Sequence, residues 1–125
     1  MKIEDFFNQQ NVIELSFFNF ENAITAAYFA RENLEIVRVN DNFRKFFPVL
    51  GNVSNAYFPD VLVQLGVSVE QVEQFVGDIN EKGWVLIPKV QINIDGKEKI
   101  YSLLSTRTRN DSFSYLNGVQ GQFVD

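Results

Sequence analysis

Two hydrophobic periods alternate along this chain, and they predict where strands and helices lie. Apolar and polar residues alternate along residues 84–94, which is typical of a half-buried strand. The pair Asp95-Gly96 follows, which is a strong signal for a two-residue hairpin turn. Residues 97–109 return as a second strand, and residues 113–125 read as a third. The C-terminal part therefore predicts three long antiparallel strands.

The clearest helical pattern lies between Ser68 and Gly83. Ser68 and Gln71 match a capping box at its start, and Gly83 is placed to end it. Apolar residues between them recur with the period of a helix and predict one buried stripe: Val72, Phe75, Val76 and Ile79. The sequence therefore predicts an amphipathic helix just before the first long strand.

The upstream half predicts a hairpin and two shorter helices. Residues 23–30 and 35–39 read as strands joined by a tight connection, in which Asn33 is expected to be left-handed. Asn40 or Asp41 then caps a short helix whose apolar face is Phe43, Phe46 and Phe47. A second helical turn begins around Pro59 and stops at Gly66.

Residues 1–21 form a separate amphipathic segment, rich in phenylalanine. Its apolar residues recur at helical spacing, and the helix they predict has two possible partners, its own domain or a second copy of the chain. The residues predicted to lie at a dimer interface are Ile3, Phe6, Phe7, Ile13 and Phe17.

Composition and charge exclude several classes of partner. The 125 residues suit one domain, here residues 22–125 behind the N-terminal cap. The net charge of −5 argues against binding to nucleic acid or to anionic membrane surfaces. No apolar run approaches the ~20 residues of a membrane span, and the N-terminus lacks the apolar block of a secretory signal. We therefore expect a cytoplasmic protein with no direct membrane contact.

The sequence contains no cysteine and no histidine, and its one methionine is Met1. These absences exclude disulfides, cysteine nucleophiles, histidine-based triads and zinc sites built on either residue. Haem held by histidine is excluded as well. We accordingly expect no metal, no required cofactor and no catalytic residue.

Three segments carry a resemblance to PAS domains, in the order that the family shows. They are "LEIVRVNDNFRKFF" (34–47), "INIDGKEKIY" (92–101) and "LNGVQGQFVD" (116–125). The first resembles the family's strand–Asn–helix unit, the second its Asp-Gly turn between long strands, and the third its C-terminal ending. Leu34 departs from the pattern, because it replaces a glycine of the first hairpin turn.

This resemblance implies an α+β fold, a five-stranded antiparallel sheet in the order 2-1-5-4-3 with helices on one face and an N-terminal helical cap. It also implies a non-catalytic sensory or dimerisation module of a larger bacterial signalling protein, such as a two-component histidine kinase, a diguanylate cyclase or a nucleotide cyclase. A homodimer is then expected, with the output domain in the same full-length chain. The family's flavin–thiol photochemistry needs a cysteine and is excluded here.

A small ligand could bind between the sheet and the helices of such a fold. The residues predicted to line that site are Tyr28, Phe43, Tyr57, Phe75, Ser102 and Asn117. The competing interpretation is that these side chains simply pack the core. Ser102 and Asn117 are the informative members, because an inward polar group needs a hydrogen-bond partner that a ligand could supply.

Two other functions stay open from the sequence. One is a small cavity enzyme or carrier of the isomerase type, which needs a buried acid with a raised pKa. We expect no Asp or Glu at an inward position. The other is a purely structural dimeriser with a filled core.

Overall fold

The computed structural model describes residues 24–109 and 117–125. Within these ranges the chain forms five strands and four helical segments: β1 (Ala26–Ala30), β2 (Ile36–Val39), α3 (Asp41–Phe46), the 3-10 helix η1 (Pro48–Leu50), α4 (Phe58–Gln64), α5 (Val69–Lys82), β3 (Trp84–Ile94), β4 (Lys97–Thr108) and β5 (Gly118–Val124). The N-terminal cap and its five predicted interface residues lie outside the described residues, as does the start predicted for the last strand.

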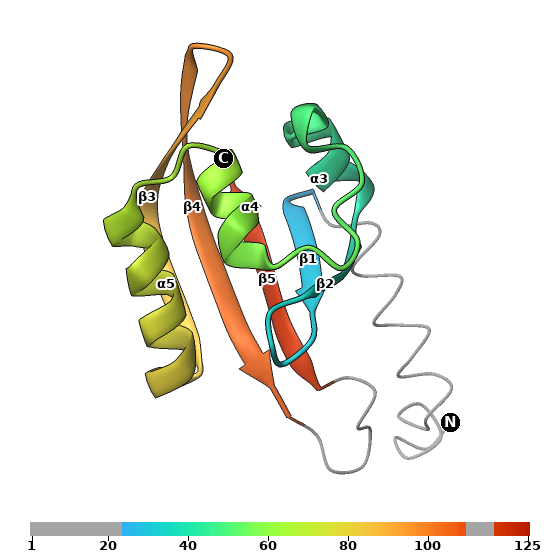
Figure 1. The fold of residues 1–125 in the computed structure, drawn as a ribbon, viewed down its shortest axis with the longest axis vertical. Helices are drawn as coiled ribbons and strands as arrows, with labels where there is room; N and C mark the ends of the chain where they lie inside the picture. Colours follow the sequence, from blue (N-terminus) through green and yellow to red (C-terminus); the bar gives the residue numbers. More distant parts are fainter. Residues whose placement is uncertain (1–23, 110–116) are drawn as a thin grey trace, which may run out of the picture.

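The five strands form one antiparallel sheet in the order β2-β1-β5-β4-β3 (Figure 1). The order predicted from the resemblance is therefore confirmed. β5, the last strand of the chain, lies in the middle and pairs with β1 on one side and β4 on the other. The C-terminal end of the described chain thus leaves the sheet from its centre.

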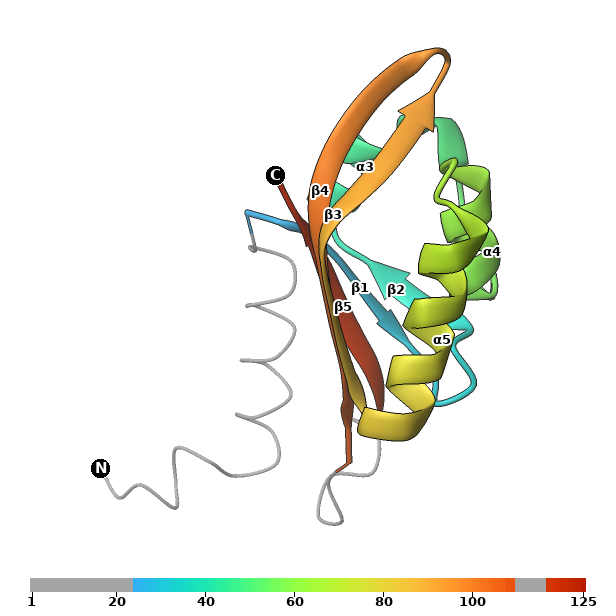
Figure 2. The same cartoon turned by 90° about the vertical axis from the view of Figure 1, so that its left-hand side faces the viewer.

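The helices cover one face of the sheet, so the α+β fold class is confirmed as well (Figure 2). α5 follows its predicted pattern, with Phe75 and Ile79 buried against the sheet and Gly83 left-handed at φ 79°. Its capping box is only half formed. The Ser68 hydroxyl accepts from the Gln71 amide at 3.3 Å, but the Gln71 side chain donates to the Lys89 carbonyl instead of returning to Ser68.

Asn40 fixes the junction between β2 and α3. Its side-chain oxygen accepts from the Phe43 amide at 2.9 Å, which confirms it as the N-cap. The same oxygen accepts from the Ala27 amide at 3.0 Å, and its amide donates to the Thr25 carbonyl at 2.9 Å. The side chain is completely buried. This asparagine therefore links the start of α3 to Ala27 in β1 and to Thr25 just before that strand.

The first hairpin turn differs from its prediction. Leu34, at φ 71°, is the left-handed residue, while Asn33 accepts from the Glu35 amide in an Asx turn. A left-handed leucine is strained by its Cβ. Its side chain is 96% buried in the core, and this burial offsets the strain.

A bulge in β3 sets which side chains face the core. Ile87 pairs with Leu103 and Val90 with Tyr101, so two residues of β3 oppose Ser102 alone. The first of those two is Pro88, which has no N–H to give to the ladder. The extra residue reverses the alternation, so Val85 and Ile87 before the bulge and Val90 and Ile92 after it are all buried.

Candidate functional site

The space between the sheet and the helices is filled by aromatic rings. Tyr28 stacks on Phe58 with centroids 3.9 Å apart. Phe123 of the central strand lies 5.0 Å from Phe47 and 6.2 Å from Phe43, Phe58 and Tyr101. Such contacts between rings add to the stabilisation that burial provides. This region is therefore a packed aromatic core.

One polar pair lies inside that core. The Tyr28 hydroxyl and the Ser105 Oγ are 2.6 Å apart, and both residues are completely buried. Gly121 makes room for them, because a Cβ there would lie 2.2 Å from Ser105 Oγ and 2.3 Å from a Tyr28 ring carbon. Burial raises the pKa of Tyr28, and the hydrogen bond to Ser105 counteracts only part of that rise.

Three of the six residues predicted to line a ligand site are core residues. Tyr28, Phe43 and Phe75 are at most 2% exposed, and each packs against other buried side chains. Phe43 touches Phe47 edge-on, and Phe75 lies 5.1 Å from Phe58. Their positions suit the packing interpretation, and a ligand-binding role for them stays a prediction.

Of the other three, Tyr57 and Ser102 do not face the core. Tyr57 precedes α4 and is 40% exposed, and Asn117 is half-buried just before β5. Ser102 lies on the opposite face and donates to the Pro88 carbonyl at 2.9 Å, in the β3 bulge. The expectation that Tyr57 and Ser102 point inward is therefore wrong. The inward serine is Ser105, three residues further along β4.

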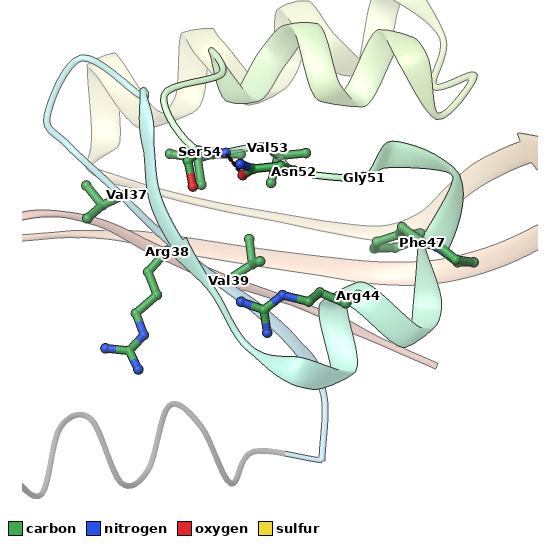
Figure 3. Close-up of a pocket in the computed structure, with 11 residues that line it drawn as sticks. Val37, Arg38, Val39, Arg44, Phe47, Gly51, Asn52, Val53 and Ser54 are labelled. Atoms are coloured by element: carbon green, nitrogen blue, oxygen red, sulfur yellow. Dashed lines mark hydrogen bonds between the residues drawn. The ribbon is translucent and has the colours of Figure 1, made fainter.

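A groove of about 600 Å³ opens beside the edge strand β2, and the core residues Ile36, Val39, Phe47 and Val53 form part of its lining. Its walls are β2, the end of α3 with η1, and the segment 51–54 (Figure 3). Asn52 shapes that segment by accepting from the Ser54 amide at 3.0 Å. The residues that line the groove are Ile36, Val37, Arg38, Val39, Arg44, Phe47, Pro48, Gly51, Asn52, Val53 and Ser54. None of these was among the predicted site residues, and only folding brings residues 36–39 and 51–54 together.

The outer face of the sheet, opposite the helices, carries exposed apolar side chains. Leu86 pairs with Leu104 across β3 and β4, and Val124 of β5 pairs with Ser102 of β4. We call this set the outer patch: Trp84, Leu86, Ile100, Leu104 and Val124, each between 37% and 56% exposed. Contiguous exposed apolar side chains of this kind mark interaction surfaces.

Lys99 connects the C-terminal end of the chain to α3. Its ammonium lies 3.2 Å from the Asp125 carboxylate and above the rings of Tyr101 and Phe46. Hydrogen bonds to Tyr101 and Asp125 raise the pKa of Lys99. The side chains of Lys99 and Asp125 are both exposed to solvent, so this ion pair is weak.

The described residues offer few side chains that could act in catalysis. Besides the tyrosines Tyr28 and Tyr101, their only buried polar residues are Asn40 and Ser105, so no acid is buried among them. No group of three potential metal ligands occurs within the same ranges. Over this part of the chain, each helix is too short or too polar to cross a membrane.

Comparison by sequence finds no relatives. No protein-family model matches the chain, and no curated protein matches it either.

Comparison by structure gives a consistent answer. A PAS domain from Colwellia psychrerythraea superposes with a TM-score of 0.66 at 9% identity, over 91% of this chain and 96% of that one. The chain has a PAS fold. A domain of a sensory box sensor histidine kinase/response regulator from Geobacter sulfurreducens gives 0.61 at 12% identity, covering 96% and 99%. A PAS domain of a LuxR-family regulator from Burkholderia thailandensis, in complex with ethanol, gives 0.57 at 15%, covering 87% and 95%.

These comparisons confirm the fold that the sequence resemblance implied. In this chain the PAS fold combines a packed aromatic core with two exposed features, which are the outer patch and the groove beside β2. The outer patch follows from the alternation of apolar and polar residues along β3 and β4. The sequence shows this alternation, but assigning its two faces requires knowledge of the bulge at Pro88. The polar pair of Tyr28 and Ser105 had no such signal, because these residues are 77 positions apart.

Proposed function

We propose that this chain is a non-catalytic sensory and dimerisation module of a larger bacterial signalling protein. The outer patch is the observation that carries the proposal. Five large apolar side chains remain exposed on this face of the sheet, although helices cover the other face (Figure 2). A second copy of the chain covers this patch in the proposed assembly, because burying apolar surface drives protein association.

The N-terminal segment takes part in the proposed dimer. Residues 1–21 are its cap and residues 22–125 its PAS domain. The phenylalanines and isoleucines predicted along the cap supply an apolar face that matches the outer patch in chemistry. Both surfaces together give the proposed dimer an apolar centre, as interfaces between like chains have.

The signal leaves the proposed module through β5. This strand runs through the centre of the sheet, and Asp125 follows its end. Asp125 pairs with Lys99, whose ammonium lies over the rings of Phe46 in α3 and Tyr101 in β4. A ligand or partner that favours one of two arrangements of α3 would shift the ion pair and the chain beyond it. Such coupling requires different affinities for the two arrangements.

Similar folds support an output domain in the same full-length chain. The Geobacter sulfurreducens domain belongs to a sensor histidine kinase/response regulator. By analogy we infer a kinase or cyclase output and a cytoplasmic location for this module. The Burkholderia thailandensis domain, solved with ethanol, supports a small ligand as one possible signal.

The filled core disfavours the enzyme alternative. An isomerase-type mechanism needs a buried carboxylate, and the described residues bury no Asp or Glu. The purely structural dimeriser shares the same dimer surface and differs only in lacking a signal.

Sedimentation of two glutamate variants tests the proposal. We expect the wild-type chain to form dimers, and Leu104→Glu in the outer patch to weaken them by at least about tenfold, since a charge would be buried there. Val63→Glu is the control, because Val63 is 58% exposed on α4 and lies outside the patch. A monomeric wild type at all concentrations, or equal weakening by both variants, would refute the proposed assembly.

A further inference from the structure

We propose that the exposed edge of β3 is closed to the addition of a further strand, so that partners of this chain are directed to the face of the sheet. β3 lies at one edge of the sheet and runs over Trp84–Ile94 (Figure 1). A long edge strand is a template for pairing with another chain, and native proteins protect such edges. The inference does not depend on the proposed dimer, because a closed edge limits the association of a monomer as well.

The bulge in the middle of β3 withholds main-chain groups that a partner strand would need. Pro88 has no N–H, so one donor is missing from the strand. The Pro88 carbonyl accepts from the Ser102 hydroxyl at 2.9 Å. The Lys89 carbonyl accepts from the Gln71 side-chain amide at 2.8 Å. A partner strand would therefore gain a hydrogen bond to either carbonyl only by competing with one that already exists.

The two donors reach the bulge from opposite faces of the sheet. Gln71 belongs to α5, which lies on the helical side, whereas Ser102 lies on the outer face of β4 (Figure 2). The sequence predicted a capping box for Gln71 and a ligand site for Ser102, and the bulge is where both side chains form their hydrogen bonds. Lys89 is itself exposed, and a charged residue on an edge strand also disfavours pairing.

The corner between α4 and α5 closes the far end of the edge. The Asn93 amide donates to the Leu65 carbonyl at 2.9 Å, so it is directed at this corner. The two backbones lie close together, because a Cβ on Gly66 would be 3.1 Å from the Asn93 carbonyl oxygen. The corner and the bulge divide β3 into the runs 84–87 and 90–92, each shorter than a usual strand of about five or six residues.

Protection matters at this edge because β3 borders the outer patch. Trp84 and Leu86 of that patch are about half exposed on this strand. An exposed, long and apolar edge strand favours aggregation. The closed edge therefore separates two modes of association: strand pairing at β3 is blocked, while the outer patch stays available to a partner.

An open-edge variant tests the proposal in the full 125-residue chain. It combines Gln71→Ala, Pro88→Val and Ser102→Ala, which restore the missing donor and free both carbonyls. The bulge should persist, because the buried residues on its two sides face the core only when it is present. Every chain compared also carries Leu104→Glu, so that the outer patch does not contribute, and the chain with Leu104→Glu alone is called the parent.

Sedimentation measures the self-association of these chains. We expect the open-edge variant to associate at least about tenfold more strongly than the parent, because each restored main-chain group adds a hydrogen bond to the pairing. Circular dichroism shows whether it is folded. If it is not, Pro88→Val in the parent restores the donor alone and should strengthen association by at least about threefold.

A matched control carries the same three kinds of substitution away from β3. These are Gln64→Ala, Pro48→Val and Ser54→Ala in the parent, all at exposed positions. Its association should stay within about twofold of the parent, because surface substitutions away from such contacts have small effects.

Gln91 reports whether association occurs at the edge. The Asn93 amide points out of the sheet toward Leu65, and main-chain directions repeat at every second residue, so the Gln91 amide points outward too. Pairing at the edge should slow hydrogen exchange of this amide by at least about tenfold in the associated open-edge variant. Adding Gln91→Pro, which removes an outward donor and no bond to β4, should return association to within about twofold of the parent.

Four results would overturn the proposal. They are a folded open-edge variant, or Pro88→Val in its place, that associates no more than the parent; an equal increase in the control; unchanged exchange of the Gln91 amide on association; or association that Gln91→Pro leaves in place. A monomeric wild type would refute the proposed dimer and leave this test intact, because the parent already carries Leu104→Glu.

Discussion

The two faces of the sheet use the same kind of residue for different purposes. The inner face buries Tyr28, Phe123 and their aromatic neighbours completely, and the helices cover it. The outer face presents Trp84, Leu86 and Leu104 with a third to a half of their surface exposed. Composition alone does not distinguish the two faces, because both are rich in apolar side chains. The difference teaches that the inner face accounts for folding, while the outer face is available for a partner.

Truncation on each face gives the largest contrast. We expect Phe123→Ala to lower the free energy of unfolding by about 3–5 kcal/mol, because it leaves a cavity among four aromatic rings. Leu104→Ala should lower it by less than about 1 kcal/mol in the monomer, since the side chain is already 37% exposed. Denaturant unfolding at low protein concentration measures both. Equal losses would show that the outer patch belongs to the folding core.

Two glycines test how tightly the inner face is packed. Gly121→Ala should destabilise the fold by about 2–3 kcal/mol, because the new Cβ meets Tyr28 and Ser105. Gly77→Ala is the matched control: it lies within α5 with nothing within 4 Å of the added Cβ, and it should stabilise by about 0.5–1 kcal/mol. Thermal unfolding compares them, and a tolerated alanine at 121 would contradict the packing described for the polar pair.

Variants of two helix caps compare the contribution of buried hydrogen bonds to stability with that of an exposed one. Asn40→Ala removes three hydrogen bonds from a completely buried site, and we expect a loss of about 2–3 kcal/mol. Ser68→Ala removes one exposed bond of 3.3 Å at the start of α5 and should cost about 1 kcal/mol or less. Urea unfolding of the two variants measures the difference. Similar losses would mean that Asn40 acts as a helix cap and nothing more.

The smallest expected effect concerns the Tyr28 hydroxyl and its dependence on pH. Tyr28→Phe should cost about 1 kcal/mol near neutral pH, because Ser105 loses its partner. The pKa of Tyr28 is raised in the fold from 10.0, so above that pH the unfolded chain loses a proton that the folded chain keeps. Stability present below pH 10 is therefore lost as pH rises, by up to about 1.4 kcal/mol per pH unit, in the wild type only.

Unfolding measured from about pH 9 to about pH 11 tests this dependence. The gap between wild type and Tyr28→Phe should narrow across that interval, and the remaining tyrosines cancel in the comparison. A gap that stays constant would contradict a buried, protonated Tyr28.

The sequence predicted those features that depend on local chemistry. The Asn40 cap, the Asp95-Gly96 turn and the start and end of α5 follow from residues close together in the chain, and all three are confirmed. The order of the strands came from the resemblance to PAS domains and is confirmed too.

The prediction failed where distant segments decide the outcome. Ser102 faces outward because the register of β4 against β3, with its bulge at Pro88, sets which residues of both strands point inward. Tyr57 is exposed because its position just before α4 places it at the surface. No local sequence pattern predicts this exposure. The groove beside β2 combines two segments that meet only in the fold.

Mixed-label NMR of the dimer tests the central claim most directly. One protomer carries labelled methyl groups, and its partner is unlabelled with protons throughout. The account predicts contacts between protomers at the methyl groups of Leu86, Leu104 and Val124, and none at the buried Val61 and Leu62 of α4. Contacts confined to the helical side, at Val63 and Val69, or no contacts between protomers at all, would contradict it.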